Sequence, residues 1–151
     1  MENSAKKAEV LNQLIEINND RIKGYETAIE NLGGKNTALA GVFNDMIQES
    51  RHYRTELIDA MGQADAVVDE STTAGGETYR GLMEVITLFS GNDLKLILSS
   101  CEGGEGAVQH AYISAIEAGV LPYDTITLLQ KQQVALKRSR DKIKALRDGE
   151  S

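Results

Sequence analysis

Apolar residues recur at intervals of three and four along almost the whole chain, which is the spacing of one face of an α-helix. The pattern predicts four long helices, over residues 4–32, 37–61, 93–118 and 123–147. Glycines interrupt the pattern between these segments, at Gly33-Gly34, Gly62 and Gly119, as is typical of helix ends. No segment shows the alternation of apolar and polar residues that indicates a strand. The predicted fold class is therefore all-α.

The connections between the helices predict how they are arranged. Short joins make the first two helices one antiparallel hairpin and the last two another. Between the hairpins lies a long connection, with a polar, glycine-rich loop from Asp69 to Gly76 and a short amphipathic helix over residues 78–89. Such a connection can cross a bundle from end to end, as in ferritin-like proteins. We predict a single domain, residues 1–151: a ferritin-like four-helix bundle with a short extra helix in its long crossover.

Each predicted helix has one polar residue near the middle of its apolar face. These residues are Asn18, Glu49, Glu105 and Gln132. In the second helix, for example, Glu49 continues the spacing of Leu39, Val42 and Met46 and is followed by Tyr53. A buried ionisable group is costly unless it is paired, hydrogen-bonded or bound to metal.

We therefore predict that the four side chains form a mid-bundle polar layer. Asn18 and Gln132 would donate amide hydrogens to Glu49 and Glu105. Hydroxyl groups one or two turns away would donate to the same carboxylates, namely those of Tyr25, Tyr53 and Tyr112.

The alternative for inward carboxylates is a metal site. A ferritin-type di-iron centre takes one Glu from each of two helices and a Glu-x-x-His pair from each of the other two. Glu49 and His52 match such a pair and Glu105 supplies a second carboxylate, but Asn18 and Gln132 cannot complete the set. The ligand count predicts no cofactor. The alternative is iron or another divalent metal held by Glu49, His52 and Glu105.

The two histidines have simpler interpretations at the surface. Glu56 lies four residues after His52, so we expect the two to form a surface pair. His110 lies about 140° around the helix from Glu105, and we expect it to be exposed. No Ser-His-Asp or Cys-His arrangement can be assembled from these residues. The sequence does not decide whether the protein is an enzyme, and it favours a non-enzymatic role.

The third helix has glycines at its centre, in the run Gly103-Gly104-Glu105-Gly106. Each interior glycine costs about 1 kcal/mol relative to alanine. We interpret the run as a close helix approach or a local bulge that makes room for a neighbouring tyrosine. Cys101, the only cysteine, is interpreted as a buried small hydrophobe. A single cysteine excludes an intrachain disulfide and fits a reducing cytosol.

Charge is unevenly distributed. The net charge of −7 makes nucleic acid an unsuitable partner. However, residues 131–151 contain seven Lys/Arg and three Asp/Glu. We interpret the last helix as a basic helix packed against acidic neighbours; the alternative is a docking surface for an acidic partner. No apolar run is long enough for a membrane span or a signal peptide, which predicts a cytoplasmic protein.

Several segments occur in an order and spacing shared with a known family. They include Leu14 to Arg21, Thr72 to Gly75, Ser100-Cys101-Glu102 with Gly104-Glu105, and Ile143 to Asp148. Across about residues 8–148 the chain resembles a bacterial ferritin-like four-helix-bundle family with an unknown-function label, number 2383 in that series. The resemblance implies a ferritin-like fold and a bacterial origin, and it implies no established activity.

These observations predict an uncharacterised bacterial bundle with a non-enzymatic structural or stress-associated role. We expect it to form a homo-oligomer, a dimer, through a helix face, without nucleic acid or membrane. The alternative function is that of a ferritin-like metal-binding or oxidase protein using Glu49, His52 and Glu105. The sequence does not identify a protein partner.

Overall fold

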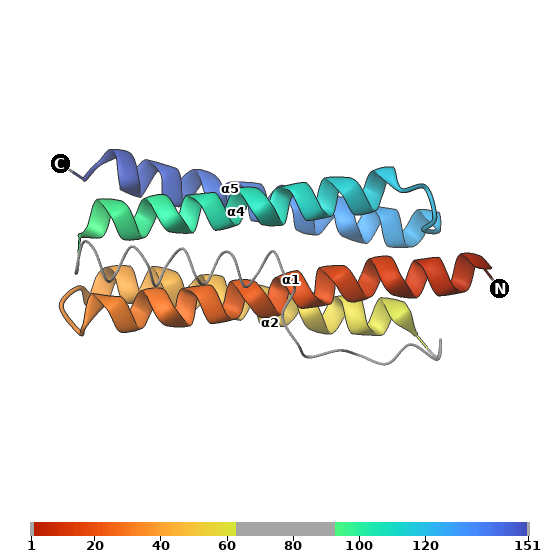
Figure 1. Cartoon of the computed structure of the whole chain (residues 1–151), viewed down its shortest axis with the longest axis horizontal. Coiled ribbons are helices and arrows are strands. Elements are labelled where there is room, and N and C mark those ends of the chain that lie inside the picture. Colours follow the sequence, from red (N-terminus) through yellow and green to blue (C-terminus); the bar gives the residue numbers. More distant parts are fainter. Residues whose placement is uncertain (1, 63–92, 151) are drawn as a thin grey trace.

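The computed structural model describes residues 2–62 and 93–150, which form four α-helices (Figure 1). They are α1 (Glu2–Leu32), α2 (Thr37–Met61), α4 (Leu94–Glu117) and α5 (Tyr123–Asp148). Together they contain more than two-thirds of the chain, and the described ranges contain no strand. The predicted all-α fold with four long helices is confirmed. The helix expected over residues 78–89 lies outside the described residues.

The helix ends follow from local chemistry. Asn36 caps α2 by accepting a hydrogen bond from the Leu39 N–H at 3.0 Å, and Asp93 caps α4 in the same way through Lys95 at 3.0 Å. Gly62 and Gly119 have φ values of 62° and 72° after α2 and α4, a conformation that strains other residues. The observed ends therefore lie within two residues of the predicted ones.

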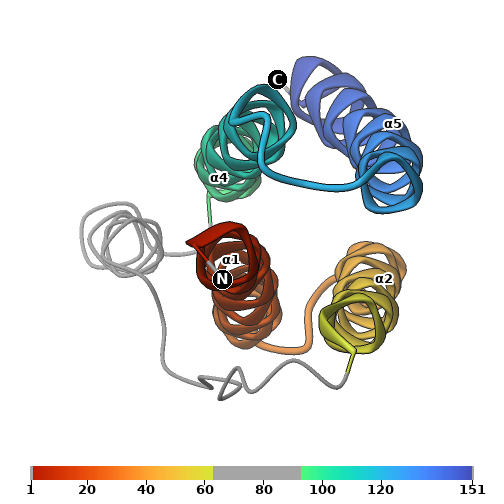
Figure 2. The same cartoon turned by 90° about the vertical axis from the view of Figure 1, so that its right-hand side faces the viewer.

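The helices form two antiparallel hairpins, α1–α2 and α4–α5 (Figure 1). The end of α2 and the start of α4 lie at opposite ends of the bundle, so these two helices run in the same direction. Seen end-on, α1 packs beside both α2 and α4, whereas α2 and α5 make the least backbone contact of the neighbouring pairs (Figure 2). No helix in the described ranges is long and apolar enough to cross a lipid bilayer.

The core is divided along the bundle axis. One apolar cluster surrounds Phe43 and Leu98 in the half that contains the α1–α2 turn. The other surrounds Leu57 and Val108 in the half that contains the α4–α5 turn. Between the clusters lie buried polar side chains: Asn18, Arg21, Ser50, Glu105 and Gln132. The polar layer therefore separates two hydrophobic cores.

The interpretation of α5 as a basic helix packed against acidic neighbours is confirmed for one of its cations among the described residues. In the part of the chain that the structure describes, only Arg147 of the α5 cations forms ion pairs, with Glu102 of α4 and with Asp148. The lysines of the helix and Arg138 are exposed, whereas Arg140 is partly buried and lies against Gly106 of α4. The buried stripe of the helix is filled by Thr125, Leu129, Gln132, Leu136 and Ile143.

Candidate functional site: a buried arginine between two carboxylates

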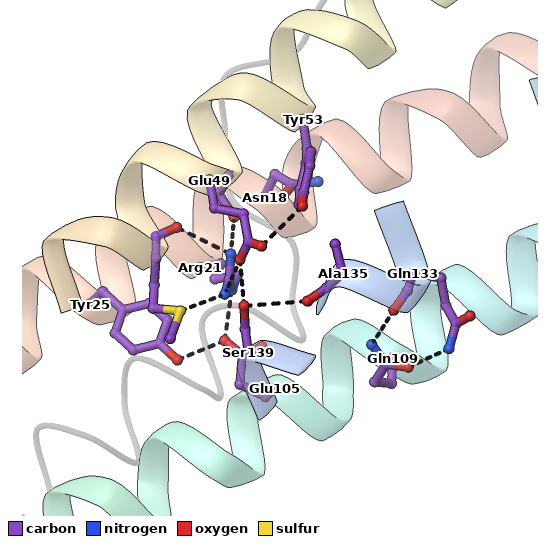
Figure 3. Close-up of polar contacts among 12 residues, drawn as sticks. Asn18, Arg21, Tyr25, Glu49, Tyr53, Glu105, Gln109, Gln133, Ala135 and Ser139 are labelled. Carbon is purple, nitrogen blue, oxygen red and sulfur yellow. Dashed lines mark hydrogen bonds and ion pairs between the residues drawn. The ribbon is translucent and has the colours of Figure 1, made fainter. Parts of the chain in front are cut away.

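The polar layer is built on the buried faces of all four helices. On α1, Asn18, Arg21 and Tyr25 follow one another at intervals of three and four, so their side chains enter the core together. Arg21 is 1% exposed and is the largest of the fully buried side chains. Helices α2 and α4 bring Glu49 and Glu105 to it from two sides (Figure 3).

Every nitrogen of the Arg21 guanidinium has a partner. Nε donates to Glu105 Oε1 at 2.6 Å, and Nη2 pairs with Glu49 Oε1 at 2.8 Å (Figure 3). Nη1 donates to Ser50 Oγ at 2.9 Å and to the Met46 carbonyl at 3.1 Å. Burial by itself lowers the pKa of Arg21, but the charge of Glu105 and other neighbours raises this pKa above its ordinary value. Arg21 is therefore a permanent cation inside the bundle.

The two carboxylates also accept hydroxyl hydrogen bonds. Tyr25 donates to Glu105 Oε1 at 2.7 Å, and Tyr53 donates to Glu49 Oε2 at 2.9 Å. These two contacts confirm the prediction that tyrosines serve the carboxylates. Ser139 of α5 adds a third, donating to Glu49 Oε1 at 2.9 Å (Figure 3). Burial and the adjacent Glu49 charge raise the pKa of Tyr53, so its hydroxyl remains a donor.

The predicted roles of Asn18 and Gln132 are wrong, although both side chains are buried as expected. Asn18 Nδ2 donates to Tyr112 Oη at 2.9 Å, and Tyr112 in turn donates to Gln132 Oε1 at 2.7 Å. Arg21 pairs with one oxygen of each carboxylate, whereas Glu105 Oε2 is buried without a hydrogen-bond partner among the described residues. Neither amide reaches that oxygen, because both are bonded to other groups. The Tyr112 hydroxyl consequently donates to the amide oxygen of Gln132 and not to a carboxylate.

Gln132 extends this network across the bundle. Its Nε2 donates to Glu56 Oε1 at 3.1 Å and to the Tyr53 carbonyl at 3.4 Å, both on α2. The network therefore includes side chains from α1, α2, α4 and α5. Glu49 is its least buried predicted member, with a side chain that is 20% exposed.

The three predicted metal ligands are not brought together. Glu49 and Glu105 converge on the Arg21 guanidinium, whereas the His52 side chain is 69% exposed and lies 3.6 Å from Glu56 as the expected surface pair. Within the described ranges, no group of three or more His, Cys, Asp or Glu residues could hold a metal ion. These residues do not fit a ferritin-type two-metal centre, because an arginine supplies the cation between the carboxylates.

Four members of the network are not predicted by the apolar pattern: Arg21, Ser50, Glu56 and Ser139. The sequence does contain a signal for Arg21. It lies three residues after Asn18 and four before Tyr25, which is the spacing of the buried face. A charged residue in that position is recognisable only when the spacing is followed through polar as well as apolar residues.

In the glycine run on α4, Gly106 lies next to an arginine of α5. The helix is continuous through residues 103–106, so no bulge interrupts it. A Cβ built at Gly106 would lie 3.3 Å from Nη2 of Arg140, a residue of α5. Cys101 is fully buried, as predicted. His110 is exposed, also as predicted.

A known protein family has a sequence pattern that matches most of the chain. The pattern of the family described as "Domain of unknown function (DUF2383)" matches residues 6–118. The matched range covers nearly all of α1 and the whole of α2 and α4, with Arg21 and both carboxylates, and it ends before α5, short of the extent that the resemblance implied. No curated protein and no solved structure matches the chain. The chain belongs to the DUF2383 family.

Proposed function

We propose that this DUF2383 protein is a non-enzymatic structural bundle, ferritin-like in topology, in which an arginine replaces the central metal. The observation that supports this proposal is the position of Arg21 between Glu49 and Glu105. Catalysis requires a reactive group that a substrate can reach, and Arg21 and Glu105 are each 1% exposed. Their contacts are with one another and with the surrounding helices.

The proposed role of the polar layer is to select one packing of the helices. A buried ion pair contributes little net stability, but an alternative packing that separates its partners leaves charges buried and unpaired. Arg21 has partners on α2 and α4 at once. A shift of either helix by one turn, about 5.4 Å, would break these contacts. The result is a bundle with a single register.

The setting we propose is the bacterial cytoplasm, with a stress-associated role and a homodimer as the working form. Tyr123 supports the dimer, because it is 87% exposed and exposed aromatic residues are enriched at protein interfaces. Sedimentation equilibrium should find a dimer that Tyr123→Ser shifts towards monomer.

The experiment that tests the structural role is metal analysis of protein purified without chelators. We expect substoichiometric iron, manganese and zinc, and no ferroxidase activity. Added Mn²⁺ should leave the Tm of the wild type unchanged and raise that of Arg21→Ala, because this variant exposes two carboxylates that have lost their cation. A stoichiometric metal that is lost in a Glu49→Ala, Glu105→Ala double variant would overturn the proposal. That result would favour the alternative, a metal-binding or oxidase protein that uses Glu49, His52 and Glu105.

A further inference from the structure

Helices α4 and α5 form a groove of about 430 Å³ whose lining residues all belong to these two helices. Three cations of α5 line it, namely Lys137, Arg140 and Lys144, and Ile113 of α4 lines its opposite side. Ile113 is 43% exposed, so the groove includes accessible apolar surface as well as charge. Gln109 and Gln133 hydrogen-bond to each other at 2.7 Å in its lining and join the two helices there (Figure 3).

The cations that line this groove outnumber its carboxylates by three to two. None of its three cations forms an ion pair within the described residues, and the Arg140 guanidinium lies over Gly106, which has no side chain to cover it. Of the two carboxylates in the lining, Glu102 forms an ion pair with Arg147, and Asp141 follows Arg140 on α5. The lining therefore keeps a small excess of positive charge. The groove is thus a basic surface on a protein whose net charge is −7.

We propose that this groove docks a short acidic helical segment of another protein. Lys137, Arg140 and Lys144 are spaced by three and four residues, so they present positive charge at each turn of α5. A partner helix with carboxylates at the same spacing would pair with them, and an apolar residue at its end would contact Ile113. The inference goes beyond the structural role, since it assigns a partner surface.

The size of the groove favours a helix over a nucleic acid. From Gln133 to Lys144 its lining on α5 extends about 17 Å, or three helical turns. A nucleic acid duplex would extend past this length on a protein whose net charge is −7, which opposes the binding of a long polyanion.

The test measures binding of a fluorescein-labelled synthetic peptide of about 11 residues, three helical turns, with Glu on one face and a terminal Leu. Fluorescence anisotropy at low salt should detect binding that weakens as NaCl is added. The Lys137→Glu, Lys144→Glu double variant should bind at least about tenfold more weakly. Ile113→Ser should weaken binding about threefold, because it removes the apolar contact.

Matched controls separate the groove from general charge. Lys131→Glu, Lys142→Glu makes the same change in charge on the same exposed helix, about 140° around it from the groove lysines. Val134→Ser removes a comparably exposed apolar residue that does not line the groove. At about 0.15 M salt, where charges more than about 8 Å apart are largely screened, both controls should change the Kd by less than about twofold. Circular dichroism melts would verify that all variants fold.

Four outcomes would overturn the proposal. They are absence of peptide binding, equal weakening by the two lysine double variants, tighter binding of a duplex DNA probe than of the peptide, and a changed oligomeric state in Lys137→Glu, Lys144→Glu. The last of these would assign the groove to a second copy of this chain. None of these outcomes changes the metal content of the protein. The peptide experiment therefore tests the groove, and the metal analysis tests the structural role separately.

Discussion

Among single residues, Arg21 has the most consequential contacts, because one guanidinium satisfies groups on two neighbouring helices. We expect Arg21→Met to lower the free energy of unfolding by about 3–5 kcal/mol. The variant keeps the volume of the side chain but leaves Glu49 and Glu105 facing each other without a cation, and Ser50 loses its donor. Urea denaturation measures the change.

Arg54 on α2 provides the matched control. Its Nη1 donates to Asn19 at 2.8 Å, and in the described part of the chain it forms no ion pair. Arg54→Met should therefore cost less than about 1 kcal/mol. Adding Glu105→Gln to Arg21→Met should recover part of the loss, since it removes one of the two unpaired charges. Equal losses in the two single variants would contradict the central role of Arg21.

The buried Tyr112 hydroxyl leads us to expect that the protein loses stability at alkaline pH. Burial raises its pKa well above the ordinary value of about 10. A raised pKa in the folded state means that the stabilisation is complete below pH 10 and decreases as the pH rises above the pKa of the unfolded chain. We expect stability to fall by up to about 1.4 kcal/mol per pH unit above pH 10 on account of this residue.

The measurement is urea unfolding between about pH 9 and 11. Tyr112→Phe should be less stable than the wild type at the lower pH, because Asn18 and Gln132 lose a hydrogen-bond partner. The free energy of unfolding of Tyr112→Phe should also decrease less steeply than that of the wild type as the pH rises. Parallel declines in the two proteins would mean that Tyr112 does not titrate above its ordinary range.

At the scale of helices, the sequence predicts the spacing of the buried residues, but it does not always predict which face of a helix is buried. On α2 the expected face ran through Val42, Glu49 and Tyr53, whereas the observed buried face includes Phe43 and Ser50. Both choices have the spacing of three and four, so the neighbours of α2 decide between them. The observed phase places the small Ser50 hydroxyl against the Arg21 guanidinium and moves Glu49 towards the edge.

The glycines of α4 allow a prediction about helix stability. Gly103 is exposed in the helix interior, and a Cβ added there would meet no atom within 4 Å. Gly103→Ala should therefore stabilise the protein by about 0.5–1 kcal/mol, the difference in helix propensity. Gly106→Ala should stabilise it less, because Arg140 must shift. Gly33→Ala should destabilise it, because Gly33 has a φ of 58°. Thermal melts of the three variants measure the order, and a loss of stability in Gly103→Ala would contradict it.

At the scale of the whole molecule, the sequence predicts which side chains enter the core better than it predicts their partners. Asn18, Glu105 and Gln132 are buried as expected because burial depends on the periodicity of their own helices. Their hydrogen bonds depend on which helices are neighbours. Arg21 reaches Glu49 and Glu105 because α1 packs beside both α2 and α4, an arrangement that no local pattern encodes.

The same arrangement makes one side of the bundle depend on side-chain hydrogen bonds. Helices α2 and α5 have the least backbone contact of the neighbouring pairs, and Gln132 of α5 links them through Glu56 and the Tyr53 carbonyl. We expect Gln132→Ala to loosen this side in particular. Hydrogen exchange measured by mass spectrometry should be about tenfold faster in the middle of α2 and α5, the equivalent of about 1.4 kcal/mol for local opening.

Gln133→Ala is the control for this last prediction, because Gln133 bonds to Gln109 and so joins α5 to α4, a pair that already packs closely. It should leave exchange in α2 unchanged. Uniform acceleration over all four helices in Gln132→Ala would mean that the bundle opens as a single unit. The polar layer would then stabilise the whole fold without holding the α2–α5 side in particular, and the separation of the core into two apolar clusters would have no dynamic consequence.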